Sequence, residues 1–157
     1  ARHVGSRRKN EGRMMNNTSN RQALVAYLQS VIDTPFRWGS FDCMNFANRA
    51  VQVQRGHGFV DDLMALHAHC SEQGALRLWR MAQRATGIAD IVDLIDSRLP
   101  RELSQYPALG SVVARPNDCE LVFSHSIGVM GSRGPIYLTP KGFKRFNRTS
   151  GDLAWTI

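Results

Sequence analysis

The stretch "PFRWGSFDCMNF", residues 35–46, places a Trp-Gly pair three residues before an Asp-Cys pair. The Asp-Cys pair opens a segment in which Cys43, Phe46 and Ala47 recur at the spacing of one helix face. Asp42 is a suitable N-cap, because its carboxylate accepts hydrogen bonds from the unpaired N–H groups of a first helical turn. The sequence therefore predicts a helix that begins at Asp42 or Cys43 and carries a cysteine in its first turn.

A cysteine at this position has two interpretations. The N-terminus of a helix favours the thiolate, which is the nucleophilic form of the side chain. Trp38 and Gly39 would then shape the wall of a cleft, and a histidine from later in the chain would take the thiol proton. In the other interpretation Cys43 is a small core residue on an apolar helix face, where free cysteines are often found. The spacing alone leaves both open.

The segment before the motif divides into two parts. The chain of 157 residues has a net charge of +7, and its first thirteen residues hold five basic side chains against one acidic one. These basic residues are Arg2, Arg7, Arg8, Lys9 and Arg13. Because residues 1–18 are also polar and poor in apolar side chains, we predict a flexible, extended arm, whose charge suits either nucleic acid or an acidic protein surface. An amphipathic helix follows, with a cap at Ser19 or Asn20, and Pro35 closes it.

After the motif the character of the chain changes from helical to extended. The Asp42 helix ends at Gly56, and two or three further helices, one of them ending at Gly87, fill residues 61–99. From residue 111 the chain reads as short β runs separated by turn residues. These runs are SVVAR (111–115), CELVF (119–123), SIGVM (126–130), PIYLT (135–139) and DLAWTI (152–157). Helices followed by strands predict an α+β domain in which one antiparallel sheet packs against helices.

The composition excludes several classes of protein. Three cysteines without CxxC spacing argue against a disulfide framework and against a zinc site. The sequence shows no apolar run of membrane-spanning length and no phosphate-binding loop, so we expect no membrane span, metal or cofactor. The basic arm is unaccompanied by a DNA- or RNA-reading motif, which makes nucleic-acid binding the least favoured of the functions we consider.

The longer stretch "PFRWGSFDCMNFANRAV", residues 35–51, resembles the nucleophile segment of the NlpC-type cell-wall peptidases, a papain-like superfamily. Its compact Trp-Gly-x-x-Asp-Cys spacing is similar to that of a small branch encoded among bacteriophage tail genes. Members of that branch end on a strand with Ala-Trp, as Ala154 and Trp155 do here. The resemblance implies a papain-like domain over residues 19–157, with a helical insertion at about 57–99 and Cys43 at the nucleophile position.

The chain departs from the family pattern where the general base is expected. The family's catalytic strand reads His, any residue, Gly, then Ile or Val. If Gly128 is the family glycine, Ser126 occupies the histidine position and His125 comes one residue early. An offset of one residue in a strand is expected to turn the side chain to the opposite face unless a β-bulge intervenes. For the polar residue that orients the imidazole, the chain offers only Tyr137 and Thr139.

His125 is thus either the base for Cys43 or a polar residue at the start of a strand. Because of the displaced histidine, we expect a structural component of a bacteriophage tail tip or baseplate, with weak or no catalysis. Its partners would be other tail proteins, and it would be made in the host cytoplasm and reside in the virion. The alternative is an active cysteine endopeptidase, with Cys43 as nucleophile, that cleaves peptidoglycan stem peptides during phage entry.

Overall fold

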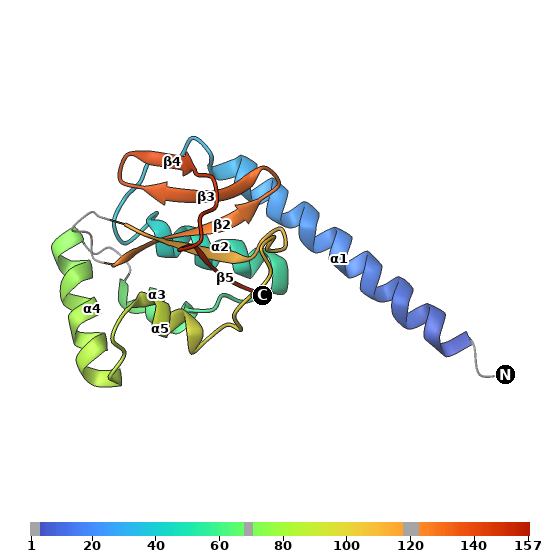
Figure 1. Cartoon of the computed structure of the whole chain (residues 1–157), viewed down its shortest axis with the longest axis horizontal. Coiled ribbons are helices and arrows are strands. Elements are labelled where there is room, and N and C mark those ends of the chain that lie inside the picture. Colours follow the sequence, from blue (N-terminus) through green and yellow to red (C-terminus); the bar gives the residue numbers. More distant parts are fainter. Residues whose placement is uncertain (1–3, 68–70, 118–122) are drawn as a thin grey trace.

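The computed structural model describes residues 4–67, 71–117 and 123–157, and it places the helices before the strands (Figure 1). The helices of these residues are α1 (Val4–Val31), α2 (Cys43–Arg55), α3 (Asp61–His67), α4 (Glu72–Thr86) and α5 (Ile91–Asp96). The strands are β1 (Val112–Pro116), β2 (His125–Gly131), β3 (Gly134–Thr139), β4 (Gly142–Arg145) and β5 (Leu153–Trp155). The strands form one antiparallel sheet in the order β4-β3-β2-β1-β5. This confirms the predicted α+β class.

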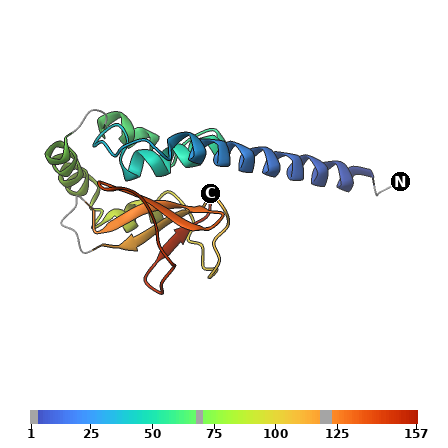
Figure 2. The ribbon, with the colours of Figure 1, turned by 90° about the horizontal axis from the view of Figure 1, so that it is seen from above.

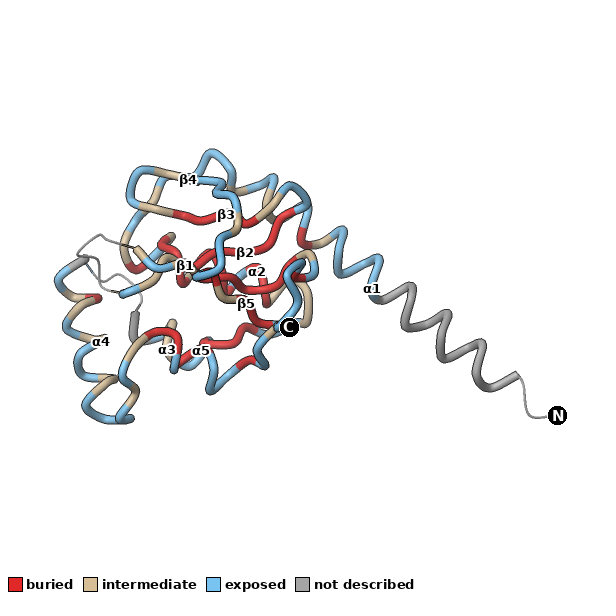
Figure 3. Tube along the Cα trace, viewed as in Figure 1, coloured by how far each residue is buried: buried red, intermediate tan, exposed pale blue. Residues whose placement is uncertain are grey.

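The helices α1 and α2 form a layer over one face of the sheet (Figure 2). The apolar face of α2 contributes Phe46, Ala47 and Ala50 to the same buried cluster as Ile127 and Val129 of β2. Buried residues are concentrated in α2 and in the central strands (Figure 3). The prediction that the helix after Asp42 packs on a sheet made from the C-terminal third of the chain is therefore confirmed.

The helix α1 is longer than the sequence predicts. Its C-terminal part corresponds to the predicted amphipathic helix, with Leu24 fully buried and Tyr27 packed against the core cluster. The extended conformation that we predicted for the arm is wrong from Val4 onward, because the backbone is helical without a break to Val31. Adding residues to a helix that tertiary contacts already hold costs far less than nucleating a new one, so polar composition alone does not end it.

The predicted helix ends are correct at two glycines. Gly56 and Gly87 follow α2 and α4 with φ of 87° and 72°, the left-handed conformation that stops a helix. Among the described residues between 61 and 99 there are three helices, but α5 begins only at Ile91, after its N-cap Asp90. Residues 88–90 therefore lie between α4 and α5 and belong to neither helix.

Four strands, β1, β2, β3 and β5, follow predicted runs closely, whereas β4 lies outside all of them. Gly131 of β2 pairs with Gly134 of β3, so Ser132 and Arg133 form the predicted turn between them. The run 119–123 falls almost wholly outside the described residues. In β5, an edge strand of the sheet, Trp155 is fully buried, and its indole Nε1 donates a 2.7 Å hydrogen bond to the Asp96 carboxylate. This contact joins the last strand to α5.

Candidate functional site

The turn before α2 has a local structure that explains its sequence. The backbones of Arg37 and Phe41 exchange two hydrogen bonds, of 2.9 and 2.8 Å, which close a tight loop between them. Gly39 stands in this loop with φ of 76°, a conformation that side chains other than glycine rarely adopt. The glycine of the Trp-Gly pair is thus required by the turn itself.

Asp42 holds this turn onto the first turn of α2. One carboxylate oxygen accepts hydrogen bonds of 3.1 Å from the N–H groups of Met44 and Asn45, and the other accepts one of 3.0 Å from the N–H of Gly39. The N–H of Asp42 in turn donates a hydrogen bond to Oδ1 of the Asn45 side chain, which completes a capping box. The Asp42 carboxylate is therefore an N-cap and a brace for the loop.

Cys43 begins α2 with its side chain turned into the core. It is only 8% exposed and belongs to the same buried cluster as Ile127 of β2. Burial is the main cause that raises the pKa of the thiol from 9.0 to about 12, and the negative charge of Asp42 is the second. Backbone hydrogen bonds, that of Ile127 foremost, oppose this shift without cancelling it. The thiol is therefore protonated at neutral pH, despite its place at a helix N-terminus.

A small pocket brings Cys43 and His125 together. Its cavity is about 20 Å³, and Trp38 lines it along with them. The remaining lining residues are Phe36, Phe123, Ser126, Leu138, Thr139 and Pro140. The ring of Trp38 is held edge-on to that of Phe36, with centroids 4.9 Å apart. A cavity of this size accommodates about one water molecule.

The one-residue offset of His125 does not turn it away from Cys43. Side chains alternate along β2, and Ile127 and Val129 lie in the cluster that contains α2. His125 shares their phase, whereas Met130 belongs to the cluster on the other face. The expectation that the offset places the imidazole on the opposite face is therefore wrong, and no bulge is needed to correct it.

The two candidates for the residue that orients His125 do not fill that role. Tyr137 is fully buried in the cluster on the other face of the sheet, and its hydroxyl has no hydrogen-bond partner among the described residues. Thr139 lines the pocket, but its hydroxyl donates to the carbonyl of Gly142 and accepts from the N–H of Lys141. Nδ1 of the imidazole lies 2.9 Å from the hydroxyl of Ser124 instead.

Two contacts at this site were missed from the sequence. One is the pairing of His125 with the neighbouring Ser124, and the other is the effect of the Ile127 backbone on the Cys43 thiol, whose pKa it lowers. A serine beside a histidine is too common to signal such a pair. The Ile127 contact depends on the distance between helix and sheet, which only packing sets.

The remaining predictions concern the basic arm, membrane spans and metal sites. Of the arm residues, Arg2 lies outside the described residues, as do the side chains of Arg7, Arg8, Lys9 and Arg13. Across the described ranges, no helix is long and apolar enough to cross a membrane. Within the same ranges, no group of three His, Cys, Asp or Glu residues could hold a metal ion.

Comparison with other proteins gives one match. No curated protein is significantly similar to the chain, and no solved structure is either. One family model covers α2, the Cys43 pocket and the whole sheet. The chain therefore belongs to the family described as "Domain of unknown function (DUF6950)", whose model matches residues 16–157.

Proposed function

We propose that this protein is a structural component of a bacteriophage tail tip or baseplate, built on an NlpC-like peptidase fold with weak or no catalysis. The assignment to tails rests on the resemblance of the Trp38–Cys43 motif to the branch encoded among tail genes. The order of elements agrees with that resemblance, because a helix that begins at Cys43 packs on a later strand that carries His125. On this proposal the partners are other tail proteins, and the protein is made in the host cytoplasm.

The observation that carries the non-catalytic part of the proposal is the state of Cys43. The thiol is buried, its pKa is raised to about 12, and the cavity beside it is about 20 Å³. Sites that bind small organic ligands are typically about 300 Å³ or larger. In this conformation a peptide bond does not reach the sulfur, and the sulfur is not in its nucleophilic form.

One observation favours the alternative function, an active cysteine endopeptidase that cleaves peptidoglycan stem peptides. Cys43 and His125 line the same pocket, from a helix N-terminus and from the start of a strand. In that reaction the imidazole accepts the thiol proton, and the thiolate attacks the scissile carbonyl carbon. The C–N bond then breaks as the imidazolium protonates the leaving amine, which forms a thioester, and water hydrolyses the thioester and restores the free thiol. The pocket would have to open for a substrate to enter.

Purified peptidoglycan distinguishes the two functions. The parent protein, Cys43→Ala and His125→Ala are incubated with sacculi, and the released peptides are analysed by mass spectrometry. We expect little or no release by the parent above that by the Cys43→Ala variant. Clear cleavage by the parent that both alanine variants abolish would establish the alternative. Cys43→Ser replaces the thiol by a hydroxyl of similar size. If this variant unfolds at the same temperature as the parent, a loss of cleavage reflects lost chemistry and not lost folding.

The place in the tail is tested on purified phage particles. Antibodies against this protein should label the tail tip or baseplate in electron micrographs of particles whose genome encodes it. Particles that carry Cys43→Ser or His125→Ala should assemble and adsorb to cells as the parent particles do. If purified particles lack the protein, the structural assignment fails, whatever the result with peptidoglycan.

A further inference from the structure

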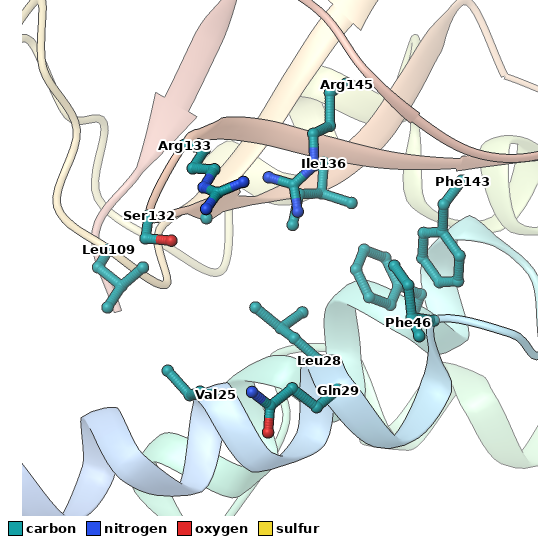
Figure 4. A pocket seen from close by; sticks show the side chains of 12 residues that line it. Val25, Leu28, Gln29, Phe46, Leu109, Ser132, Arg133, Ile136, Phe143 and Arg145 are labelled. Carbon is teal, nitrogen blue, oxygen red and sulfur yellow. The ribbon is translucent and has the colours of Figure 1, made fainter.

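An open groove lies between α1 and the end of the sheet that carries β3 and β4 (Figure 4). Its volume is about 380 Å³. The helix side is formed by Val25, Leu28, Gln29 and Ile32, and the sheet side by Ile136, Phe143 and Arg145 together with the turn at Arg133. This groove shares no lining residue with the pocket of Cys43 and His125, so the two can be studied separately.

The helix side of the groove is an exposed apolar strip. Val25, Leu28 and Ile32 are spaced as successive positions of one helix face, with Ile32 directly after the end of α1. Val25 is 40% exposed and Ile32 47% exposed. At the rise of an α-helix the strip is about 10 Å long. A strip of two helical turns, open along its length, fits an extended or helical peptide segment better than a compact small molecule.

The sheet side of the groove adds two uncompensated positive charges. Figure 4 shows the guanidinium groups of Arg133 and Arg145 at the opening, across from Val25 and Leu28. Neither has a side-chain hydrogen bond or ion pair with another described residue, and every charged residue that lines the groove is basic.

Two other arginines of this chain are neutralised within it. Arg98 makes two hydrogen bonds to the Asp62 carboxylate, of 2.8 and 2.9 Å, and Arg101 makes two to Asp96. A guanidinium group fits a carboxylate in this two-bonded geometry, which is also the usual way in which arginines bind acidic partners. Arg133 and Arg145 offer the same geometry without an internal acceptor.

We propose that this groove docks a segment of a partner protein that presents apolar side chains to α1 and carboxylates to Arg133 and Arg145. Charge complementarity selects the partner, because the charged side chains of the lining are those of Arg133 and Arg145 and no carboxylate lines the groove to hold a cationic segment. The proposal names the chemistry of a partner and does not rest on the assignment to phage tails.

A random peptide library displayed on yeast tests the proposal. The library is sorted for binding to the full chain, and the recovered peptides are measured against two double variants. Arg133→Gln with Arg145→Gln removes both charges of the groove. Arg77→Gln with Arg84→Gln removes the same charge from exposed positions of α4. A third variant, Ile32→Asp, places a negative charge on the apolar strip.

We expect peptides that combine Asp or Glu with aliphatic or aromatic residues. Their affinity should fall about tenfold or more with the groove double variant, since two charge-assisted contacts are lost. Ile32→Asp should cause a similar fall, and the α4 double variant should change the affinity less than about twofold. Equal thermal unfolding of all variants shows that binding, and not folding, has changed.

Three outcomes would overturn the proposal. The first is a library that yields no peptide whose binding depends on the groove. The second is a set of recovered peptides without acidic residues. The third is an α4 double variant that weakens binding as much as the groove double variant does. Decanoate, an anion with an aliphatic chain, is titrated in parallel. If decanoate binds in a groove-dependent manner and no peptide does, the groove is a small-molecule site and the proposal is wrong.

Discussion

Cys43 and His125 line one pocket from different layers of the fold, the cysteine from the first turn of α2 and the histidine from the first residue of β2. This is the arrangement that a thiol and its base require. The surroundings oppose the chemistry, because burial and the neighbouring Asp42 carboxylate both favour the protonated thiol. The placement of the two side chains thus favours catalysis, whereas the protonation of the thiol opposes it. The reactivity of Cys43 is therefore the quantity to measure.

We expect Cys43 to react slowly with iodoacetamide. In a variant in which Cys70 and Cys119 are replaced by serine, Cys43 is the one remaining thiol. Because its pKa is raised from 9.0 to about 12, the thiolate fraction at pH 8 should be lower in the folded chain than in urea, and alkylation about a hundredfold slower or more. Mass spectrometry over time measures both rates, with Cys43→Ala as the blank. Rapid alkylation of the folded chain below pH 8 would contradict the buried, protonated state.

Gly128 should not tolerate a side chain. It stands opposite Tyr137 in the sheet, and a Cβ atom at this position would collide with the backbone carbonyl oxygen of Ile136 and lie 2.8 Å from Cδ1 of Tyr137. Backbone cannot move aside cheaply, so we expect Gly128→Ala to lower the free energy of unfolding by about 1–3 kcal/mol. Urea unfolding measures the change.

Gly151→Ala is the matched control for this substitution. Its new Cβ would approach only the ring of Pro116, at 3.8 Å, which is an ordinary contact. We expect its effect to stay within about 0.5 kcal/mol. If the two alanine variants are equally stable, the close approach of β3 to Gly128 is not a constraint on the fold.

Signals that act within a few residues made much of this fold predictable. Asp42 caps α2, and Gly56 and Gly87 end helices, because the capping groups are adjacent in sequence to the backbone groups that they satisfy. The start of α1 was not predictable in the same way. Its first residues continue a helix that Leu24 anchors, and composition does not show where such a continuation ends.

The candidate site shows the same limit. The sequence identified Cys43, Trp38 and His125, but the face on which His125 lies depends on the phase of β2. That phase is fixed by its pairing with β1, in which His125 lies opposite Pro116 and Ile127 opposite Ala114. Side chains of a strand alternate between the two faces of its sheet. When one of the two sets consists of small residues such as Ser126 and Gly128, the sequence pattern does not show which set faces the helices.

The Asp96 carboxylate should stabilise the C-terminal strand. It accepts the hydrogen bond from the buried indole of Trp155 and two from Arg101, whose guanidinium also lies over the indole ring at 5.1 Å. Asp96→Ala leaves the indole N–H without its acceptor, so we expect a loss of about 1–2 kcal/mol in the free energy of unfolding. Asp33→Ala, at an exposed position, should change it by less than about 0.5 kcal/mol.

The contribution of Asp96 should also depend on pH. Hydrogen bonds from Arg101, and secondarily from Trp155, hold the pKa of the carboxyl below its ordinary value of 3.8. Its stabilising effect is therefore fully present above that value and is lost as the pH falls through the lower folded pKa. The difference between the parent and Asp96→Ala, measured by urea unfolding, should shrink in strong acid. A difference that grows in acid would show that the carboxylate does not make these contacts in solution.

The final prediction concerns how α1 is anchored. The contacts of α1 with the core come from its C-terminal part, where Leu24 is fully buried and Tyr27 donates a 3.1 Å hydrogen bond to the carbonyl of Phe46. The N-terminal part of the helix extends away from the rest of the fold (Figure 1). We therefore expect deletion of residues 1–13 to change the free energy of unfolding by less than about 0.5 kcal/mol. Leu24→Ala should lower it by about 2–5 kcal/mol, since a buried leucine leaves a cavity. Urea unfolding with circular dichroism measures both, and a deletion as destabilising as Leu24→Ala would show that the first turns of α1 contact the domain.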